Sequence, residues 1–260
     1  MKDKKMIICY IVLMLFIIVF FFSLYHVIVW YIDNKNTNQL IYKLQDMVSI
    51  KDTDKTITTE VLDTTRYYNE DLLSVDFTNL LEENGEVVGW IEIPYTNINY
   101  PFVQHNNNSF YLNHSFDNSY NNAGWIYLDY RNKIDPIDTN TIIYAHGRVD
   151  GTMFGSLKKI LSEEWLEHDM YVIKISTLSY NYLFEIFSAY HIKTTNDYLM
   201  TNFFNTETYQ SFLDTIIKRS MIDFSVNVST ENKILTLSTC YNNREKMVVH
   251  GKLVKQEKRY

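Results

Sequence analysis

The sequence contains few of the residues on which several protein classes depend. Its 260 residues include only 2 cysteines, 3 prolines and 7 glycines. Two cysteines exclude a disulfide-rich scaffold, and the chain has no C-x-x-C motif or Cys/His pairing that would suggest a zinc ribbon. The few glycines and prolines, with 15% aromatic residues, exclude a disordered or fibrous protein. A basic excess is also missing: the net charge of −7 argues against nucleic acid as a partner.

One long apolar run, Met6–Trp30, is broken only by Ser23 and His26. About 20 apolar residues in a helix span the roughly 30 Å hydrocarbon core of a bilayer, whereas a cleavable signal peptide has an apolar stretch of about 7–15. We therefore expect a single-pass transmembrane helix in the cell membrane. Three lysines precede the run, so the positive-inside rule places residues 1–5 in the cytoplasm and residues 33–260 outside the cell.

This division of the chain separates the two cysteines. Cys9 lies in the apolar run, which leaves Cys240 as the only cysteine of the exported part. An exported thiol without an intramolecular partner is open to oxidation, so its presence calls for a chemical reason. The alternative is a small buried hydrophobic residue, as free cysteines often are.

The exported part begins with polar, helical sequence and continues as short apolar runs. Helical spacing occurs at Leu40–Val48 and again at Leu72–Leu81, with a linker at residues 51–59 between them. The chain thus divides into residues 1–32 as cytoplasmic tip and membrane anchor, 33–84 as polar linker and N-terminal helices, and 85–260 as a strand-rich domain.

The last part is predicted to be mainly β. Its closely spaced strand patterns, with one longer helix at Glu207–Arg219 before the last two, are typical of a small closed or nearly closed β-barrel. The predicted strands are Val87–Ile93, Tyr100–Val103, Trp125–Leu128, Thr141–Tyr144, Tyr171–Ile175, Tyr182–Tyr190, Ile234–Thr239 and Met247–Val254.

Two predicted strands end in residues that can carry chemistry. Ile234–Thr239 is followed by Cys240, and a nucleophilic cysteine needs a base or cation nearby because the thiolate is the reactive form. Among seven histidines, His146 is distinguished because it ends an apolar strand and is followed at once by Gly147. A rigid strand end is a common place for a catalytic group, whereas structural roles are the more common explanation for the other histidines.

Three separated motifs resemble the class B sortases, and they occur in the family's order over residues 70–254. The Cys motif Thr236-Leu-Ser-Thr-Cys240 copies the T-L-S-T-C signature of that class. The motifs are Thr236–Cys240 with Met247–Lys252, Ile143–His146 with Gly151–Gly155, and Gly89–Ile93 with Ile98–Pro101.

The resemblance implies a closed eight-stranded sortase barrel and a membrane-anchored cysteine transpeptidase of a Gram-positive bacterium. Cys240 would attack the carbonyl after Thr in an N-P-x-T-x-type sorting motif of a surface protein and form a thioester. His146 would act as general acid and then general base. The acceptor would be an amine of a peptidoglycan precursor or cross-bridge, and no metal or cofactor is required because the thioester conserves the energy of the amide.

The family also carries an arginine that stabilises the oxyanion, immediately before the apolar strand that follows the cysteine. In this sequence Lys246 occupies that position, and Arg244 lies two residues earlier. Residues two apart on a strand share a face, so Arg244 is the preferred candidate and Lys246 the alternative. Ser238, Thr239 and Tyr209 are carried over as substrate-binding residues, each with an ordinary packing role as the alternative.

Three other functions remain open at this point. A pilin-polymerising sortase would use a pilin lysine as the acceptor. A non-catalytic wall-binding protein on a sortase barrel would explain the Lys246 substitution. A membrane-tethered cysteine peptidase would hydrolyse the thioester because water outcompetes the amine.

Overall fold

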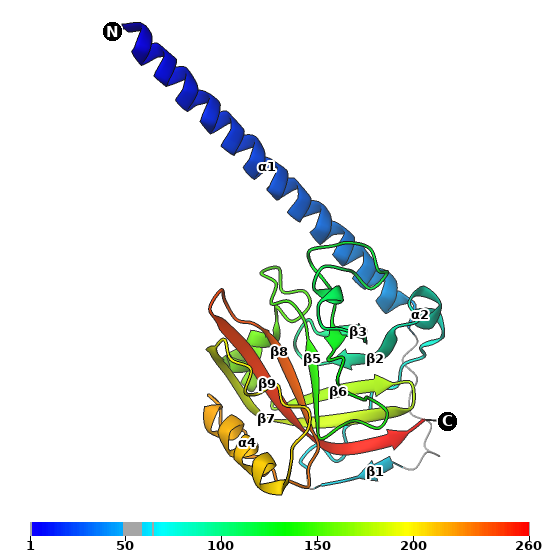
Figure 1. The fold of residues 1–260 in the computed structure, drawn as a ribbon. Helices are drawn as coiled ribbons and strands as arrows, with labels where there is room; N and C mark the ends of the chain where they lie inside the picture. Colours follow the sequence, from blue (N-terminus) through cyan, green and yellow to red (C-terminus); the bar gives the residue numbers. More distant parts are fainter. Residues whose placement is uncertain (1, 49–58, 64, 260) are drawn as a thin grey trace. The chain divides into compact units, whose positions relative to one another are not determined.

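The computed structural model describes residues 2–48, 59–63 and 65–259, which form two compact units, residues 1–42 and 43–260 (Figure 1). The first unit belongs to helix α1 (Lys2–Asp46), which contains the apolar run. This helix is long and apolar enough to cross a membrane. The helical pattern at Leu40–Val48 is the end of α1 and not a separate helix, because no Gly or Pro interrupts the chain after Trp30. The predicted linker lies outside the described residues except for Thr59.

The second unit is a β-barrel, and it confirms the predicted closed eight-stranded fold. The strands follow the order β9-β7-β6-β2-β3-β4-β5-β8, and β8 pairs back onto β9 to close the sheet. A short ninth strand, β1, pairs with the end of β9 beyond β8. The bounds are β1 (Thr59–Val61), β2 (Val87–Glu92), β3 (Asn99–Val103), β4 (Tyr127–Leu128), β5 (Asn140–Tyr144), β6 (Val172–Thr177), β7 (Tyr180–Lys193), β8 (Ile234–Cys240) and β9 (Glu245–Lys258).

Short helices fill the connections, and the one longer helix lies before the last two strands, as predicted. That helix, α4, begins after Asn205, whose side chain accepts a hydrogen bond from the N–H of Thr208 and so caps the helix. The helices of the barrel unit are α2 (Thr78–Glu83), α3 (Glu163–Leu166) and α4 (Thr206–Arg219), with 3₁₀ turns η1 (Phe110–Leu112) and η2 (Leu157–Leu161).

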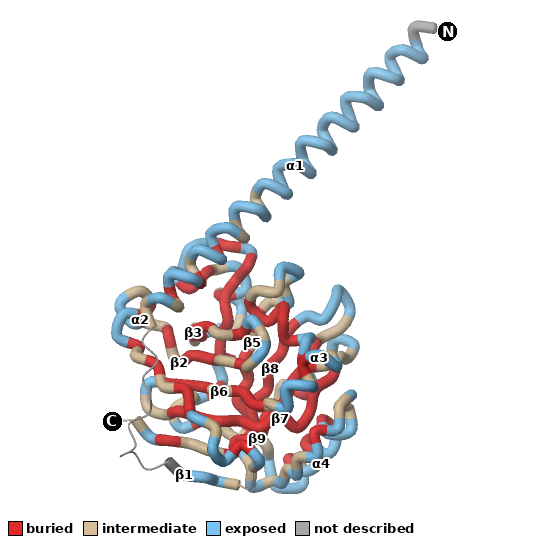
Figure 2. The backbone as a smooth tube through the Cα atoms, turned by 180° about the vertical axis from the view of Figure 1, so that it is seen from behind, coloured by how far each residue is buried: buried red, intermediate tan, exposed pale blue. Residues whose placement is uncertain are grey.

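The core lies inside the barrel and under α4, where the strands are almost continuously buried (Figure 2). The apolar face of α4, which includes Leu213 and Ile216, packs against β7 and β9 through Tyr190 and Val248. Because β7 and β9 are buried on both faces, their sequences contain runs of apolar residues and do not alternate strictly between apolar and polar residues.

The second predicted helix is only half correct. The pattern at Leu72–Leu81 predicts helix throughout, but α2 begins at Thr78, and the residues before it are not helical. The main chain of Val75 explains the difference: its N–H donates to the Ser176 hydroxyl at 3.1 Å, and its carbonyl accepts from Arg259 at 2.6 Å. These bonds to the barrel replace the bonds that a helix would make.

Candidate active site

Cys240 is the last residue of β8, and it is exposed, whereas the six preceding residues of the strand are buried. Its partner across the β8–β9 hairpin is Lys246. The Lys246 Nζ donates to the Cys240 Sγ at 3.2 Å. A positive charge therefore touches the atom that must become negative when the cysteine acts as a nucleophile.

His146 lies two residues beyond the end of β5, which runs parallel to β8. The register pairs Tyr144 with Ser238, so His146 and Cys240 follow at neighbouring ends of the two strands. The His146 Nε2 donates to the carbonyl oxygen of Leu112 at 2.7 Å. Because a carbonyl oxygen only accepts, this bond keeps the proton on Nε2 and leaves Nδ1 as the basic nitrogen.

Gly147 brings these two strand ends together. A Cβ atom on residue 147 would lie 2.0 Å from the Cys240 carbonyl oxygen and 3.1 Å from the Thr239 hydroxyl. The main chains can approach this closely only because residue 147 has no side chain. The glycine of the His-Gly pair therefore allows the main chain that follows His146 to lie against the main chain of Cys240.

Arg244 does not share the strand face of Lys246. Strand β9 begins at Glu245, and Arg244 belongs to the preceding turn, where its N–H donates to the Asn242 side chain at 2.8 Å. The premise that residues 244 and 246 alternate along one strand is therefore wrong, because the turn interrupts the alternation. The Arg244 side chain is exposed and bonds to no described group, whereas Lys246 reaches the sulfur.

The structure places Ser238 and Thr239 beneath the cysteine, where both side chains are buried. The Ser238 hydroxyl is 3.1 Å from the hydroxyl of Tyr198, and the Thr239 hydroxyl donates to the Ala145 carbonyl at 2.7 Å. The second bond joins β8 to the His146 strand end. These two hydroxyls thus fix the end of β8 against its neighbours.

Tyr209 lies in the core under α4 and is 3% exposed. Its ring packs against Phe203 and Phe212, and its hydroxyl donates to the Asn232 carbonyl at 2.8 Å. The structure leaves almost no Tyr209 surface on which the expected substrate contact could form. It is a packing residue of the helix that covers this side of the barrel.

Two groups of the site were missed by the sequence analysis. The Leu112 carbonyl orients His146, but a main-chain acceptor has no side-chain signature in a sequence. Tyr198 bonds to Ser238 from the segment between β7 and α4, 40 residues away in the chain. Its only signal was a tyrosine in a polar loop.

A buried acid with two tyrosines lies beside the site. The Arg131 guanidinium donates two hydrogen bonds to Asp129, at 2.9 and 2.7 Å, and the Tyr144 hydroxyl donates another at 2.9 Å. Burial alone would raise the pKa of Asp129, but these bonds hold it below its ordinary value. Burial and the nearby Asp129 charge raise the pKa of Tyr127 and Tyr144, so both phenols stay protonated and can donate.

Two cavities open at Cys240. The smaller, about 70 Å³, includes Phe154 and Met247 in its lining, and the larger, about 280 Å³, includes Thr194 and Glu245. No group of three or more His, Cys, Asp or Glu side chains that could hold a metal ion occurs among the described residues.

Comparisons with known proteins agree with this arrangement. A sortase domain model matches residues 91–254. Sortase B of Staphylococcus aureus (strain NCTC 8325 / PS 47) is 36% identical over 183 residues, which cover 69% of this chain and 75% of that protein. Sortase B of Listeria monocytogenes serovar 1/2a (strain ATCC BAA-679 / EGD-e) is 35% identical over 223 residues, which cover 82% and 87%.

Solved structures give the same result. Sortase B from Bacillus anthracis in complex with AAEK1 superposes with a TM-score of 0.71 at 32% identity, covering 86% of this chain and 99% of that one. A Staphylococcus aureus sortase B–substrate complex has a TM-score of 0.65 at 36% identity, covering 69% and 84%. The fold and the sequence matches define a cysteine transpeptidase, and the chain belongs to the sortase family. Within that family it is of class B.

Proposed function

We propose that this sortase cleaves a sorting motif in a surface protein and transfers the protein to an amine of the cell wall. The observation that carries the proposal is the contact of the Lys246 ammonium with the Cys240 thiol at the end of β8, next to the end of β5 that leads to His146. Two cavities, of about 70 and 280 Å³, include Cys240 in their lining at the same edge.

In the first half-reaction, the Cys240 thiolate attacks the carbonyl carbon of the Thr in the motif. The amide C–N bond breaks, and the leaving amine takes a proton from His146 Nδ1, while Nε2 keeps its bond to Leu112. A thioester remains on the enzyme. In the second half-reaction, an amine attacks the thioester, loses a proton to His146, and displaces the thiolate.

Lys246, in place of Arg244, is proposed to stabilise the oxyanion of both tetrahedral intermediates. It touches the sulfur, so its ammonium group lies within reach of an oxygen on the carbon bound to that sulfur. A lysine offers a point charge and not the planar fork of an arginine. Ser238 and Thr239 are proposed to act through the position of Cys240, because both are buried and bonded to neighbouring elements.

The substrates are proposed by similarity. A Staphylococcus aureus relative is described in complex with a substrate, and a sortase B is described in complex with triglycine. We propose an N-P-x-T-x-type motif as donor and a glycine-type or other wall amine as acceptor. The apolar α1 supports an anchor in the cytoplasmic membrane, with the N-terminus in the cytoplasm and the barrel on the outer surface.

The test uses the full-length protein in detergent with quenched N-P-x-T-x peptides, with and without triglycine. We expect cleavage that is lost in Cys240→Ala and in His146→Ala, and a peptide–triglycine product. Cleavage that survives Cys240→Ala would contradict the proposal. A lysine peptide that outcompetes triglycine would favour the pilin-polymerising alternative, and hydrolysis with no adduct would favour the peptidase.

A further inference from the structure

Another cavity, apart from the two at Cys240, lies at the opposite end of β8 and has a volume of about 490 Å³, within the range of small-ligand sites. Its lining includes Lys252 of β9, which pairs with Ile234 at the start of β8, whereas Lys246 pairs with Cys240 at the end. Six residues of strand separate the two places, a distance of about 20 Å. The cavity is therefore separate from the catalytic edge.

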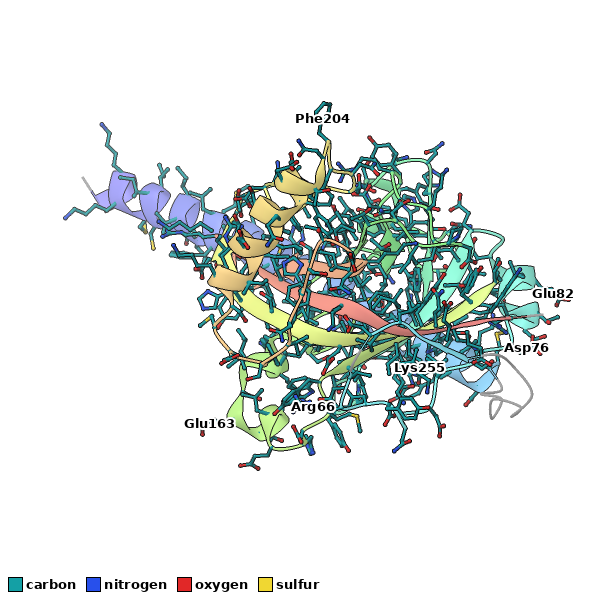
Figure 3. The ribbon with its side chains drawn as sticks, turned by 90° about the horizontal axis from the view of Figure 1, so that it is seen from below. Arg66, Asp76, Glu82, Glu163, Phe204 and Lys255 are labelled. Carbon is teal, nitrogen blue, oxygen red and sulfur yellow. The ribbon has the colours of Figure 1, made fainter. Side chains whose placement is uncertain are left out.

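Of the two acids that line this cavity, Asp63 and Glu185, the second has the weaker ion pairing. Lys252 donates to Asp63 at 3.3 Å, and Arg66, labelled in Figure 3, donates to Asp169 at 2.9 Å. Glu185 faces the cavity from β7 and is 5% exposed, and among the described residues its nearest cationic partner is Arg66, 3.9 Å away. That separation is too long for a hydrogen bond.

The surroundings of Glu185 leave its charge only partly balanced. Burial raises the pKa of Glu185, and the charges of Lys252 and Arg66 with the Thr65 hydroxyl offset this only in part. Among the described residues, the ion pairs of this cluster involve three carboxylates and two cationic side chains, so the negative charges outnumber the positive ones by one. A ligand that brings one positive charge to Glu185 would complete the cluster.

The rim of the cavity suits a peptide. The segment Val226–Val228 has no helix or strand partner, and the N–H groups of these three residues donate to no described acceptor. The carbonyl of Asn227 accepts from Lys252 at 2.8 Å, which fixes the segment beside the cavity. An extended chain with free N–H groups can pair with the carbonyls of a second extended chain.

We propose that this cavity binds an extended peptide through a lysine side chain, with the ammonium group at Glu185 and the peptide main chain along Val226–Val228. The net charge of −7 on the whole chain favours a cationic partner. The proposed site is independent of the catalytic residues. It would hold a basic segment of a partner protein or of a wall peptide while the reaction proceeds at the other end of β8.

The test is calorimetric titration of the full-length protein in detergent with acetyl-Ala-Lys-Ala-amide and with the same peptide containing norleucine in place of lysine. We expect saturable 1:1 binding of the lysine peptide, at least 10-fold weaker binding of the norleucine peptide, and a loss of that preference in Glu185→Gln. The matched control is Glu82→Gln, an exposed acid on α2. A second variant, Asn227→Trp, covers the rim without touching the buried charges and should also weaken binding.

Three results would overturn the proposal: no saturable binding at millimolar peptide, equal binding of both peptides, or unchanged binding in folded Glu185→Gln and Asn227→Trp. Loss of binding in Cys240→Ala, or competition by an N-P-x-T-x peptide, would move the lysine peptide to the catalytic edge and would also overturn it. Cleavage by the wild-type protein is measured in parallel, so failure of this site is distinguishable from failure of the proposed reaction.

Discussion

At the scale of single residues, the site depends on a few short contacts around one sulfur atom. The Lys246 Nζ lies 3.2 Å from the Cys240 Sγ, and the main chain of Gly147 lies against the cysteine carbonyl. Cys240 and His146 could be predicted from the sequence because their chemistry depends on the identity of their side chains. The sequence led to Arg244 in place of Lys246 because it does not show where the turn ends and strand β9 begins.

The choice between the two cations is testable by substitution. We expect Lys246→Ala to lower kcat by a factor on the order of 10²–10³, because one oxyanion donor is lost. Arg244→Ala should change kcat less than threefold, since its exposed side chain forms no hydrogen bond or ion pair with a described residue. Lys246→Arg should recover part of the rate. Cleavage of a quenched peptide measures the rates of all three variants. Loss of activity in Arg244→Ala with retained activity in Lys246→Ala would assign the oxyanion role to Arg244.

The close approach at Gly147 gives a second prediction. Gly147→Ala places a methyl group 2.0 Å from the Cys240 carbonyl oxygen, so the strand ends must separate. We expect a destabilisation of about 1–3 kcal/mol and at least a 10-fold loss of cleavage rate. Gly85→Ala is the matched control, because no atom lies within 4 Å of its added Cβ. Thermal unfolding and peptide cleavage measure the two effects, and equal behaviour of the two variants would refute the account of Gly147.

At the scale of elements, buried polar contacts hold the strands that carry the site. His250 of β9 is fully buried between the Tyr190 hydroxyl, 3.0 Å from Nε2, and the Thr236 hydroxyl, 2.9 Å from Nδ1. These bonds join β7, β8 and β9 beneath α4. The strand pattern predicted the elements well, because apolar periodicity is local, whereas the segment before Thr78 became extended through bonds to distant strands that periodicity does not encode.

The same histidine predicts how stability depends on pH. Burial lowers the pKa of His250 from 6.5 to about 3. The unfolded chain therefore binds a proton that the folded chain excludes, and stability falls as the pH drops below 6.5. Between pH 7 and pH 4 the loss from this group is about 3 kcal/mol.

Urea unfolding at pH 7 and pH 4 checks this expectation in the wild type and in His250→Gln. The variant should be less stable at pH 7, because it disturbs both hydrogen bonds. Its further loss on acidification should be smaller than that of the wild type. Equal losses in the two proteins would show that His250 does not carry the pH dependence.

At the scale of the whole molecule, the chain consists of an apolar helical unit and a barrel unit with its own core. The unbroken apolar run and the compact set of strand patterns are both visible in the sequence, but the predicted anchor ends at residue 32, whereas the helical unit of the structure extends to residue 42. The cavity at Glu185 was not predictable, since its lining comes from segments more than 180 residues apart. The low cysteine count agrees with the proposed role of the thiol, because the barrel unit contains one cysteine and that cysteine is exposed at the proposed catalytic edge.

Removing residues 1–42 should separate the two units without loss of chemistry. We expect the shortened protein to leave the membrane fraction and to cleave a soluble peptide at a rate within twofold of the full-length protein in detergent. Sedimentation with membranes and peptide cleavage measure the two properties. Retention of the shortened protein in membranes would contradict an anchor in α1.

The central claim is that Cys240 forms a thioester with the cleaved substrate, and intact-protein mass spectrometry tests it most directly. The full-length protein is mixed with an N-P-x-T-x peptide without an amine and quenched in acid, and the site of the adduct is mapped by proteolysis. We predict a mass increase equal to the peptide fragment that ends in Thr, located on Cys240, which disappears when triglycine is added. Cleavage with no adduct on Cys240 would contradict the account.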